Sequence, residues 1–201
     1  MRLILATRNA HKAREFAALM APHEIEPLPD DVELPPETGE TFAENALGKA
    51  RAAAAATGQP AFADDSGIAA EALGGRPGVR SARYAGEDAT DEQNLQKLLD
   101  EAPAGSRLAY VCAIAFVDPG GTEHVVEGRC EGTLSDDPRG TGGFGYDPAF
   151  VPDEQVAAGR AGGRPLTMAE LEPADKDAIS HRGRAARALL EWLGGDPPSA
   201  G

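Results

Sequence analysis

Two consecutive carboxylates, Asp64 and Asp65, close an apolar run and are followed by Ser-Gly. Mg²⁺ prefers hard oxygen ligands and keeps waters and substrate phosphates in its shell, so one or two carboxylates are enough to hold it. Glu44 is a natural second carboxylate. The sequence therefore offers Asp65 and Glu44 as metal residues, although Glu44 also completes a capping box with Thr41, a role that tolerates glutamine where a metal ligand does not.

A polar segment near the N-terminus, TRNAHK at residues 7–12, separates an apolar run from a helical pattern. The first N–H groups of a helix and the positive end of its dipole form an anion site at such turns. Thr7 and Asn9 add hydrogen-bond donors and Lys12 adds a charge. The spacing is not that of a Walker A loop. The alternative is an ordinary polar turn in which Thr7 caps the helix.

A glycine-rich segment, RGTGGFGYDP at residues 139–148, holds Phe144 and Tyr146 where the backbone must turn sharply. An aromatic ring fixed in such a loop offers a flat face to a nucleobase, and stacking of this kind is worth ~1 to 3 kcal/mol. The alternative is an aromatic side chain that fills the core beneath the loop.

A basic segment at the start of the last predicted helix carries Lys176, Ser180, His181 and Arg182, which supply charge and hydrogen-bond donors. The alternative is a solvated basic helix end. Taken together, the four segments match one ligand that has phosphates, a metal ion and a planar base. That ligand is a nucleoside triphosphate.

Apolar periodicity predicts the elements that must position these residues. Strands are expected at 2–6, 24–28 and 61–65, the last broken by the DSG sequence, and a long antiparallel hairpin at 108–118 and 122–134. Helices are expected from residue 13, at 41–58, 68–73, 90–99, 168–171 and 177–193. Parallel βαβ pairing followed by a hairpin predicts an α/β fold with a mixed sheet.

Length and composition limit the classes of protein. At 201 residues the chain predicts a single domain over residues 1–195 with a flexible tail at 196–201. A formal net charge of −14 disfavours binding to nucleic acid or to anionic membranes. No apolar run reaches the roughly 18 residues of a membrane span. Cys112 and Cys130 lie in apolar runs, as expected of buried thiols in a reducing cytoplasm.

Charge is segregated along the chain. Residues 24–44 contain eight acidic side chains and no lysine or arginine, whereas residues 176–187 contain one lysine, one histidine and three arginines. An anionic ligand is therefore expected near the second stretch.

Five blocks, in order, resemble the signatures of the inosine triphosphate pyrophosphatase family, the non-canonical purine nucleoside triphosphate pyrophosphatases. They are ATRNAHK, TFAENALGKA, FADDSGIAAEALGGRPGVRSARYAG, PRGTGGFGYDPAF and KDAISHRGRAARAL. The resemblance runs from residue 2 to about 193. It implies hydrolysis of ITP, dITP or XTP to the monophosphate and pyrophosphate, with Mg²⁺ as the cofactor.

The resemblance also assigns roles to residues of this chain. Asp65 resembles the catalytic proton acceptor and a metal residue, Glu44 a second metal residue, and Lys12 and Lys49 catalytic phosphate contacts. The remaining substrate contacts implied are Thr7, Arg8, Asn9, Ala10, His11, Ser66, Phe144, Gly145, Tyr146, Asp147, Lys176, His181 and Arg182.

The family resemblance further implies an elongated mixed sheet with helices on both sides, two lobes around a central cleft, and a homodimer. The cysteine usage and the lack of an apolar span predict a cytoplasmic protein. Donors from His181 or Arg182 would match the 6-oxo group of hypoxanthine and reject adenine. Two rival functions remain open. One is a house-cleaning pyrophosphatase for other modified nucleotides, and the other is a nucleotide-binding module without catalysis, which could dispense with Asp65 and Glu44.

Overall fold

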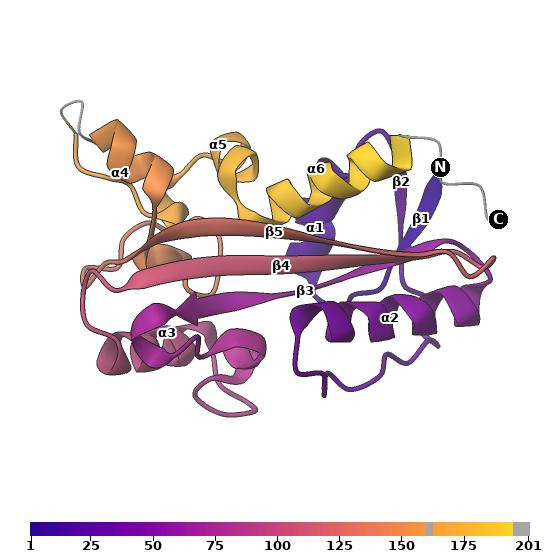
Figure 1. Cartoon of the computed structure of the whole chain (residues 1–201), viewed down its shortest axis with the longest axis horizontal. Coiled ribbons are helices and arrows are strands. Elements are labelled where there is room, and N and C mark those ends of the chain that lie inside the picture. The colour runs from indigo at the N-terminus through magenta and orange to yellow at the C-terminus, as the bar shows by residue number, and fades with distance from the viewer. Residues whose placement is uncertain (160–162, 195–201) are drawn as a thin grey trace. The chain divides into compact units, whose positions relative to one another are not determined.

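The computed structural model describes residues 1–159 and 163–194, which form two compact units (Figure 1). Unit 1 consists of Met1–Asp65, Cys112–Gly128 and the chain from Arg182 onward, and unit 2 consists of Ser66–Val111 and Arg129–His181. The boundaries between the units fall inside three strands. The tail expected at 196–201 lies outside the described residues.

The strands form one mixed sheet in the order β2-β1-β3-β4-β5-β6. Their bounds are Arg2–Leu5 (β1), Glu24–Pro27 (β2), Ala61–Ala70 (β3), Arg107–Val117 (β4), Glu123–Leu134 (β5) and Phe150–Pro152 (β6). β1 pairs in parallel with β2 and β3, whereas β5 and β6 are antiparallel. β4 and β5 are neighbours joined by only five residues, the hairpin expected from the sequence. The predicted α/β fold with a mixed sheet is confirmed.

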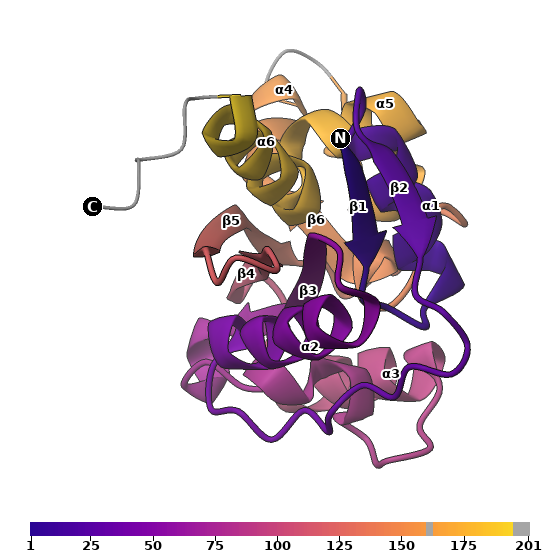
Figure 2. The same cartoon turned by 90° about the vertical axis from the view of Figure 1, so that its right-hand side faces the viewer.

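Unit 1 places helices on both faces of its strands (Figure 2). The helix α2 (Phe42–Thr57) packs on one face, and α1 (Ala10–Leu19) and α6 (His181–Gly194) pack on the other. Side chains alternate along each strand, so one face of the strands is alanine-rich and the other is bulky. The first face carries Ile4, Ala61, Ala63, Ala113 and Ala115, and the second carries Leu3, Leu5, Phe62, Ile114 and Phe116.

The helix α2 has clear end signals. Thr41 and Glu44 form the expected capping box at its start, and Gly58 ends it in the left-handed conformation with φ of 65°. Its buried face is built from Ala46, Ala50, Ala53 and Ala54. Small side chains let the helix approach the sheet closely, which brings its polar residues near the ends of the strands.

Unit 2 has its own core, formed by residues such as Ile68, Leu98, Phe150 and Met168. The helix α3 (Asp91–Glu101) lies on one face of its strands, and α4 (Asp153–Gly159) and α5 (Pro173–Ile179) lie on the other (Figure 1). Short 3₁₀ helices complete the unit, at Glu71–Leu73, Gly78–Arg83, Asp147–Ala149 and Met168–Glu170.

The structure corrects the prediction at β3. The strand does not break at DSG but continues to Ala70, so the helix expected at 68–73 is only a 3₁₀ turn at its end. The cause is a tertiary contact, because Ser81 Oγ accepts a hydrogen bond from Ile68 N and donates to Gly78 O. A Cβ on Gly67 would lie 2.4 Å from Ser81 Oγ, so glycine is needed there for packing.

The last third of the chain also differs from the prediction. The single helix expected at 177–193 is two helices, α5 and α6, because Ser180 between them is extended with ψ of 155°. The structure also contains β6 and α4, where the sequence predicted no strand or helix.

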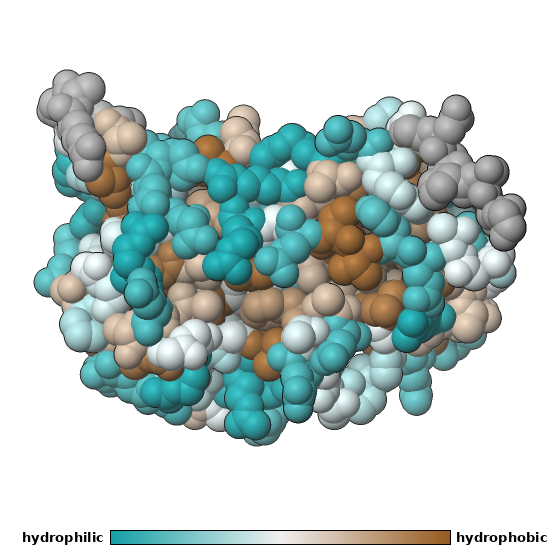
Figure 3. All heavy atoms as spheres, in the orientation of Figure 1, coloured by the Kyte–Doolittle hydropathy of each residue, from teal (hydrophilic) through white to brown (hydrophobic). Residues whose placement is uncertain are grey.

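The surface is largely polar. Among the described residues, only Met1 and Val125 are exposed large hydrophobic side chains. Hydrophilic residues surround smaller hydrophobic areas on the face drawn in Figure 3. No helix in the described ranges is long and apolar enough to cross a membrane.

Candidate active site

Asp65 lies on the β3 face that packs against α2 and is 6% exposed. Its Oδ2 accepts a hydrogen bond of 2.8 Å from Asn45 Nδ2. Burial raises the pKa of Asp65 and the charge of Glu37 adds to this, while Lys49 and Asn45 oppose the shift. A carboxyl group with a raised pKa is suited to accept a proton near neutral pH.

Asp64 points to the opposite face of β3, as alternation along a strand requires. It is 1% exposed and forms an ion pair of 2.8 Å with Lys12 Nζ and one of 3.6 Å with Arg182 Nε. Burial acts against ionisation, but the charges of Lys12, Arg182 and Lys49 outweigh it and lower the pKa of Asp64. Asp64 therefore stays ionised and holds Lys12 and Arg182 in place. Asp65, on the opposite face of the strand, does not take part in these ion pairs.

Asn45 and Lys49 lie four residues apart on one face of α2, so both reach the same strand. Lys49 Nζ donates to Glu37 Oε1 and to the backbone oxygen of Asp64, both at 2.6 Å. Burial lowers the pKa of this amine, but the charges of Asp64 and Glu37 more than compensate, and the net shift is upward. Lys49 is thus a fixed positive charge beside Asp65.

The turn before α1 is held by its own side chains. Asn9 is the N-cap, and its Oδ1 accepts from the N–H groups of His11 and Lys12, while Thr7 Oγ1 accepts from Asn9 N. The alternative in which Thr7 caps the helix is wrong, because the capping oxygen belongs to Asn9. Ala10 begins α1, and Ala10 and His11 are exposed.

Arg8 takes part in a different contact. Its guanidinium donates to the backbone oxygens of Leu28, Pro29 and Val32 at 3.0, 2.7 and 2.7 Å. These bonds tie the turn to the segment that follows β2. The side chain predicted as a substrate contact has a structural role here.

Two other carboxylates, Glu44 and Glu37, could share a metal ion with Asp65. Glu44 Oε2 accepts from the N–H groups of Glu40 and Thr41, which is the capping role. Glu37 acts electrostatically on Asp65, so it is a second acidic neighbour that the sequence analysis missed. No group of three or more metal-ligating side chains occurs within the described ranges. Mg²⁺ bound by substrate phosphates needs only one or two carboxylates, so this donor set fits it.

A second cluster forms in unit 2 around Asp147, which is 4% exposed. Its Oδ2 accepts from Lys176 Nζ at 2.9 Å and from Phe144 N at 3.1 Å, and its Oδ1 accepts from Tyr110 Oη at 3.0 Å. Lys176 Nζ also lies 5.5 Å from the centre of the Phe144 ring. The loop and α5 are therefore joined through one buried carboxylate.

The two aromatic residues of the glycine-rich loop have different surroundings. Tyr146 is buried in the core of unit 2 and donates to Ser81 O at 2.7 Å, whereas Phe144 is partly exposed. Of the two, only Phe144 is available to stack on a base. Gly143 has φ of 75°, and a Cβ there would lie 2.1 Å from Asp147 Oδ2, so the close approach requires glycine.

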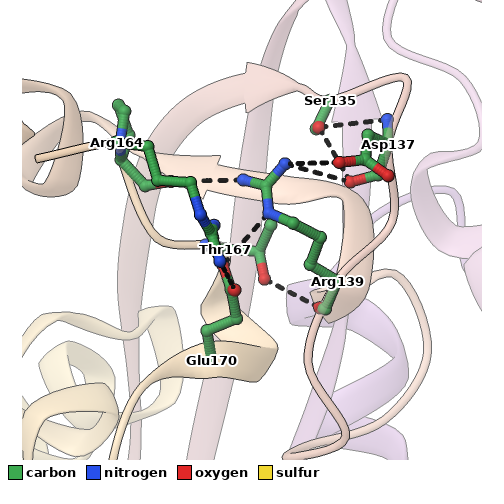
Figure 4. A network of polar contacts seen from close by, with 7 residues as sticks. Ser135, Asp137, Arg139, Arg164, Thr167 and Glu170 are labelled. Atoms are coloured by element: carbon green, nitrogen blue, oxygen red, sulfur yellow. Dashed lines mark hydrogen bonds and ion pairs between the residues drawn. The ribbon is translucent and has the colours of Figure 1, made fainter.

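The base of this loop is clamped by a polar network (Figure 4). The Arg139 guanidinium donates to Glu170, to Asp137 and to the backbone oxygen of Pro165. Glu170 also pairs with Arg164, and Thr167 Oγ1 donates to Arg139 O. These contacts join the start of the loop at residues 137–139 to the segment at residues 164–170.

The other predicted site residues fall into both units. In unit 1, Arg182 is 6% exposed and its Nη1 donates to Glu15 at 3.1 Å. In unit 2, His181 is 3% exposed, Ser66 is half-buried in β3, and Gly145 N donates to Asp91.

The structure thus brings Lys12, Lys49, Asp65 and Arg182 together in unit 1, and Phe144, Asp147, Lys176 and His181 together in unit 2. The sequence motifs did not indicate the structural roles of Asn45, Glu37 and Tyr110, or a function for Asp64. One signal was available for Asn45 and Lys49, since two polar residues share the alanine face of a buried helix.

A profile of the Ham1 family matches residues 3–192. The chain is 49% identical over 197 residues to a protein named dITP/XTP pyrophosphatase from Geobacillus kaustophilus, covering 94% of this chain and 92% of that one. It is 47% identical to a protein of the same name from Shigella flexneri, covering 96% of this chain and 98% of the other.

Solved structures agree. A HAM1 protein from Coxiella burnetii superposes with a TM-score of 0.83 at 38% identity, covering 96% of this chain and 98% of that one. A nucleoside-triphosphatase, or dITP/XTP pyrophosphatase, from Mycobacterium abscessus gives 0.71 at 45% identity, with 94% and 99% covered.

Proposed function

The chain belongs to the Ham1 family, and we propose that it hydrolyses non-canonical purine nucleoside triphosphates, such as ITP, dITP and XTP, to the monophosphate and pyrophosphate. It is therefore a nucleoside triphosphate pyrophosphohydrolase, a hydrolase of acid anhydrides. The main support for this activity is the contrast between two adjacent aspartates on β3. Asp64 is ionised and paired with cations, whereas the pKa of Asp65 is raised.

Asp65 orients a water molecule and accepts its proton as the water oxygen attacks the α-phosphorus. The bond between the α-phosphorus and the bridging oxygen breaks, and pyrophosphate leaves with the electron pair. Lys12, placed by Asp64 at 2.8 Å, and Lys49 stabilise the negative charge that develops on the phosphates. Local cations are essential because the protein itself carries a net charge of −14.

Asp65 would bind Mg²⁺ together with a second carboxylate, either Glu44 as the sequence suggested or Glu37, whose charge acts on Asp65. When bound, the ion supplies charge neutralisation on the phosphates. Lys49 keeps Glu37 in place through its 2.6 Å hydrogen bond. The chain's own contribution is thus a pair of acidic side chains held by fixed donors.

The base is recognised by the unit 2 cluster, with Phe144 as the stacking face and Lys176 and His181 as donors. Hypoxanthine and xanthine present a 6-oxo acceptor where adenine has a 6-amino donor. A buried donor left without a partner costs about 1 to 3 kcal/mol, so ATP is rejected.

We also propose a homodimer, as the family resemblance implies. Length, charge and cysteine usage support a single domain over residues 1–195, a cytoplasmic location, and a small-molecule substrate rather than nucleic acid or a membrane. The thiols of Cys112 and Cys130 are both buried, which fits a reducing compartment.

A substrate panel tests the function. The protein is assayed with Mg²⁺ against ITP, dITP, XTP, GTP, ATP and modified pyrimidine triphosphates, and pyrophosphate is measured separately from orthophosphate. We expect pyrophosphate release from ITP, dITP and XTP, with kcat/KM for ATP lower by ~10-fold or more. Orthophosphate as the product, or equal kcat/KM for ATP and ITP, would contradict the proposal. Preference for a modified pyrimidine would indicate a different house-cleaning enzyme.

A further inference from the structure

Tyr110 lies on β4, outside every sequence block that suggested the function, and is 6% exposed. Its hydroxyl donates to Asp147 Oδ1 at 3.0 Å, and its ring stacks on the imidazole of His181 with centroids 4.5 Å apart and planes 5° apart. We propose that Tyr110 is a positioning residue that holds the base-recognition groups and sets the discrimination between 6-oxo and 6-amino purines. This inference rests on the proposed function of the same cluster.

The hydroxyl matters because Asp147 is buried and joins three segments. Its Oδ2 receives Lys176 Nζ and Phe144 N, while Oδ1 receives the Tyr110 hydroxyl. A carboxylate with donors on both oxygens has a fixed plane. When the hydroxyl is removed, the carboxylate can rotate, and Lys176 and the loop at Phe144 move with it.

The ring matters because it is rigid. Phe150 packs against Tyr110 with ring centroids 4.7 Å apart, and the backbone of Tyr110 belongs to a regular strand. His181 is the first residue of α6, where the chain has just turned at Ser180. A strand holds a side chain more accurately than a helix end does, so the orientation of the imidazole follows from the tyrosine.

Loss of this support affects the two substrates unequally. The donors at Lys176 and His181 can form hydrogen bonds with the 6-oxo acceptor of ITP but not with the 6-amino group of ATP. A small displacement therefore weakens binding of ITP more than binding of ATP, and the ratio of their kcat/KM values falls. The turnover number with ITP changes little, because the contacts of Tyr110 are with the base-recognition groups.

The test compares Tyr110→Phe, which removes only the hydroxyl, with Tyr110→Leu, which also removes the stacked ring. The matched control is Tyr84→Phe, since Tyr84 belongs to the same core and its hydroxyl donates to Glu101. Values of kcat and KM are measured for ITP and ATP with the full-length enzyme. We expect Tyr110→Phe to raise KM for ITP roughly 5-fold and to lower the ITP-to-ATP ratio by a similar factor, with kcat within about twofold.

Tyr110→Leu should lower the ratio further, and Tyr84→Phe should leave it unchanged. If Tyr110→Phe and Tyr84→Phe give the same ratio as the wild type, or if Tyr110→Phe lowers kcat equally for both substrates, the inference is overturned. Thermal unfolding of each variant is measured alongside. If Tyr110→Leu does not fold, the conclusion is drawn from Tyr110→Phe. A wild type that hydrolyses ITP and ATP equally overturns the proposed function, and this inference with it.

Discussion

Two buried carboxylates each hold a lysine, Asp64 with Lys12 at 2.8 Å in unit 1 and Asp147 with Lys176 at 2.9 Å in unit 2. Asp64 lies inside a regular strand and has further cations around it, which lower its pKa. Asp147 follows a glycine-rich loop and receives one charged and two neutral donors. The arrangement around Asp64 concentrates positive charge, which is suited to binding phosphates. The arrangement around Asp147 fixes the orientation of hydrogen-bonding groups, which is suited to recognising a nucleobase.

The supports of the two sites differ as well. Asp64 and Asp65 are held by the sheet and by α1, α2 and α6, which bury their apolar faces against it. The loop of unit 2 depends on the Arg139 and Glu170 network, in which Arg164 is 57% exposed (Figure 4). Exposed ion pairs are weak and are screened by salt, so the Arg164 pair contributes little stability, whereas the side chains of Arg139 and Glu170 are only 24% and 14% exposed.

The largest effect is expected for Asp65→Asn, which should impair hydrolysis but not binding of the nucleotide. Asp65→Asn removes the proton acceptor, so kcat for ITP should fall by ~10² to 10⁴-fold while ITP binding persists. Burial raises the pKa of Asp65 above the ordinary carboxylate value of about 3.9. As the pH decreases towards this raised pKa, Asp65 takes up a proton and can no longer act as a base, so the wild-type kcat/KM should fall. Pyrophosphate release across a pH series and calorimetric binding of ITP measure both effects.

The matched control is Asp100→Asn, an exposed carboxylate on α3 whose contact is with Gln96. It should leave kcat unchanged. If Asp65→Asn keeps kcat within a few-fold of the wild type, the distinction between the two aspartates on β3 is wrong.

Asp64→Asn tests the stability of the unit 1 site. Removing the carboxylate takes away the 2.8 Å partner of Lys12 and one of the acidic neighbours of Arg182, and the free energy of unfolding at neutral pH should fall by about 3 kcal/mol. The folded pKa of Asp64 lies below its unfolded value of about 3.9, so its contribution is present above that pH and is lost as the pH falls through the folded pKa. The difference between variant and wild type in urea unfolding should therefore shrink below about pH 4.

Glu123→Gln is the control for that measurement, because Glu123 pairs with Arg51 on the surface of the same unit. An exposed pair is screened by solvent and contributes little to stability. Equal losses in the two variants would contradict the buried role of Asp64.

The smallest effect is expected for Glu170→Gln in the clamp of the unit 2 loop. Arg139 keeps its bonds to Asp137 and Pro165, so the free energy of unfolding should fall by at most about 1 kcal/mol and KM for ITP should rise only slightly. Hydrogen bonding by Arg164 lowers the pKa of Glu170 to about 2 from 4.5, so its contribution is complete above pH 4.5 and is lost between about pH 4.5 and 2.

Thermal unfolding at low and high salt measures this, and the difference from the wild type should diminish in high salt. A loss as large as that of Asp64→Asn would mean that the clamp supports the whole of unit 2.

Local sequence signals predicted the regular elements well. The capping box at Thr41 and the glycine at 58 set the ends of α2, and two β-rich runs on either side of a Pro-Gly-Gly turn indicated the hairpin of β4 and β5. They failed at two places. A contact from Ser81, elsewhere in the chain, extends β3 past its polar residues, and the extended backbone of Ser180 itself divides the last helix.

The sequence by itself determined which residue types could serve the reaction, because acidic, basic and glycine-rich segments are visible as local patterns. It also determined the family, since five such segments follow one another in order. Only the tertiary structure decided the use of each side chain. Adjacent aspartates on β3 have opposite pKa shifts because they face different helices, Tyr146 belongs to the core while Phe144 is available to a ligand, and Tyr110 meets Asp147 across 37 residues of chain. Burial and pairing are properties of the folded neighbourhood, which no local pattern contains.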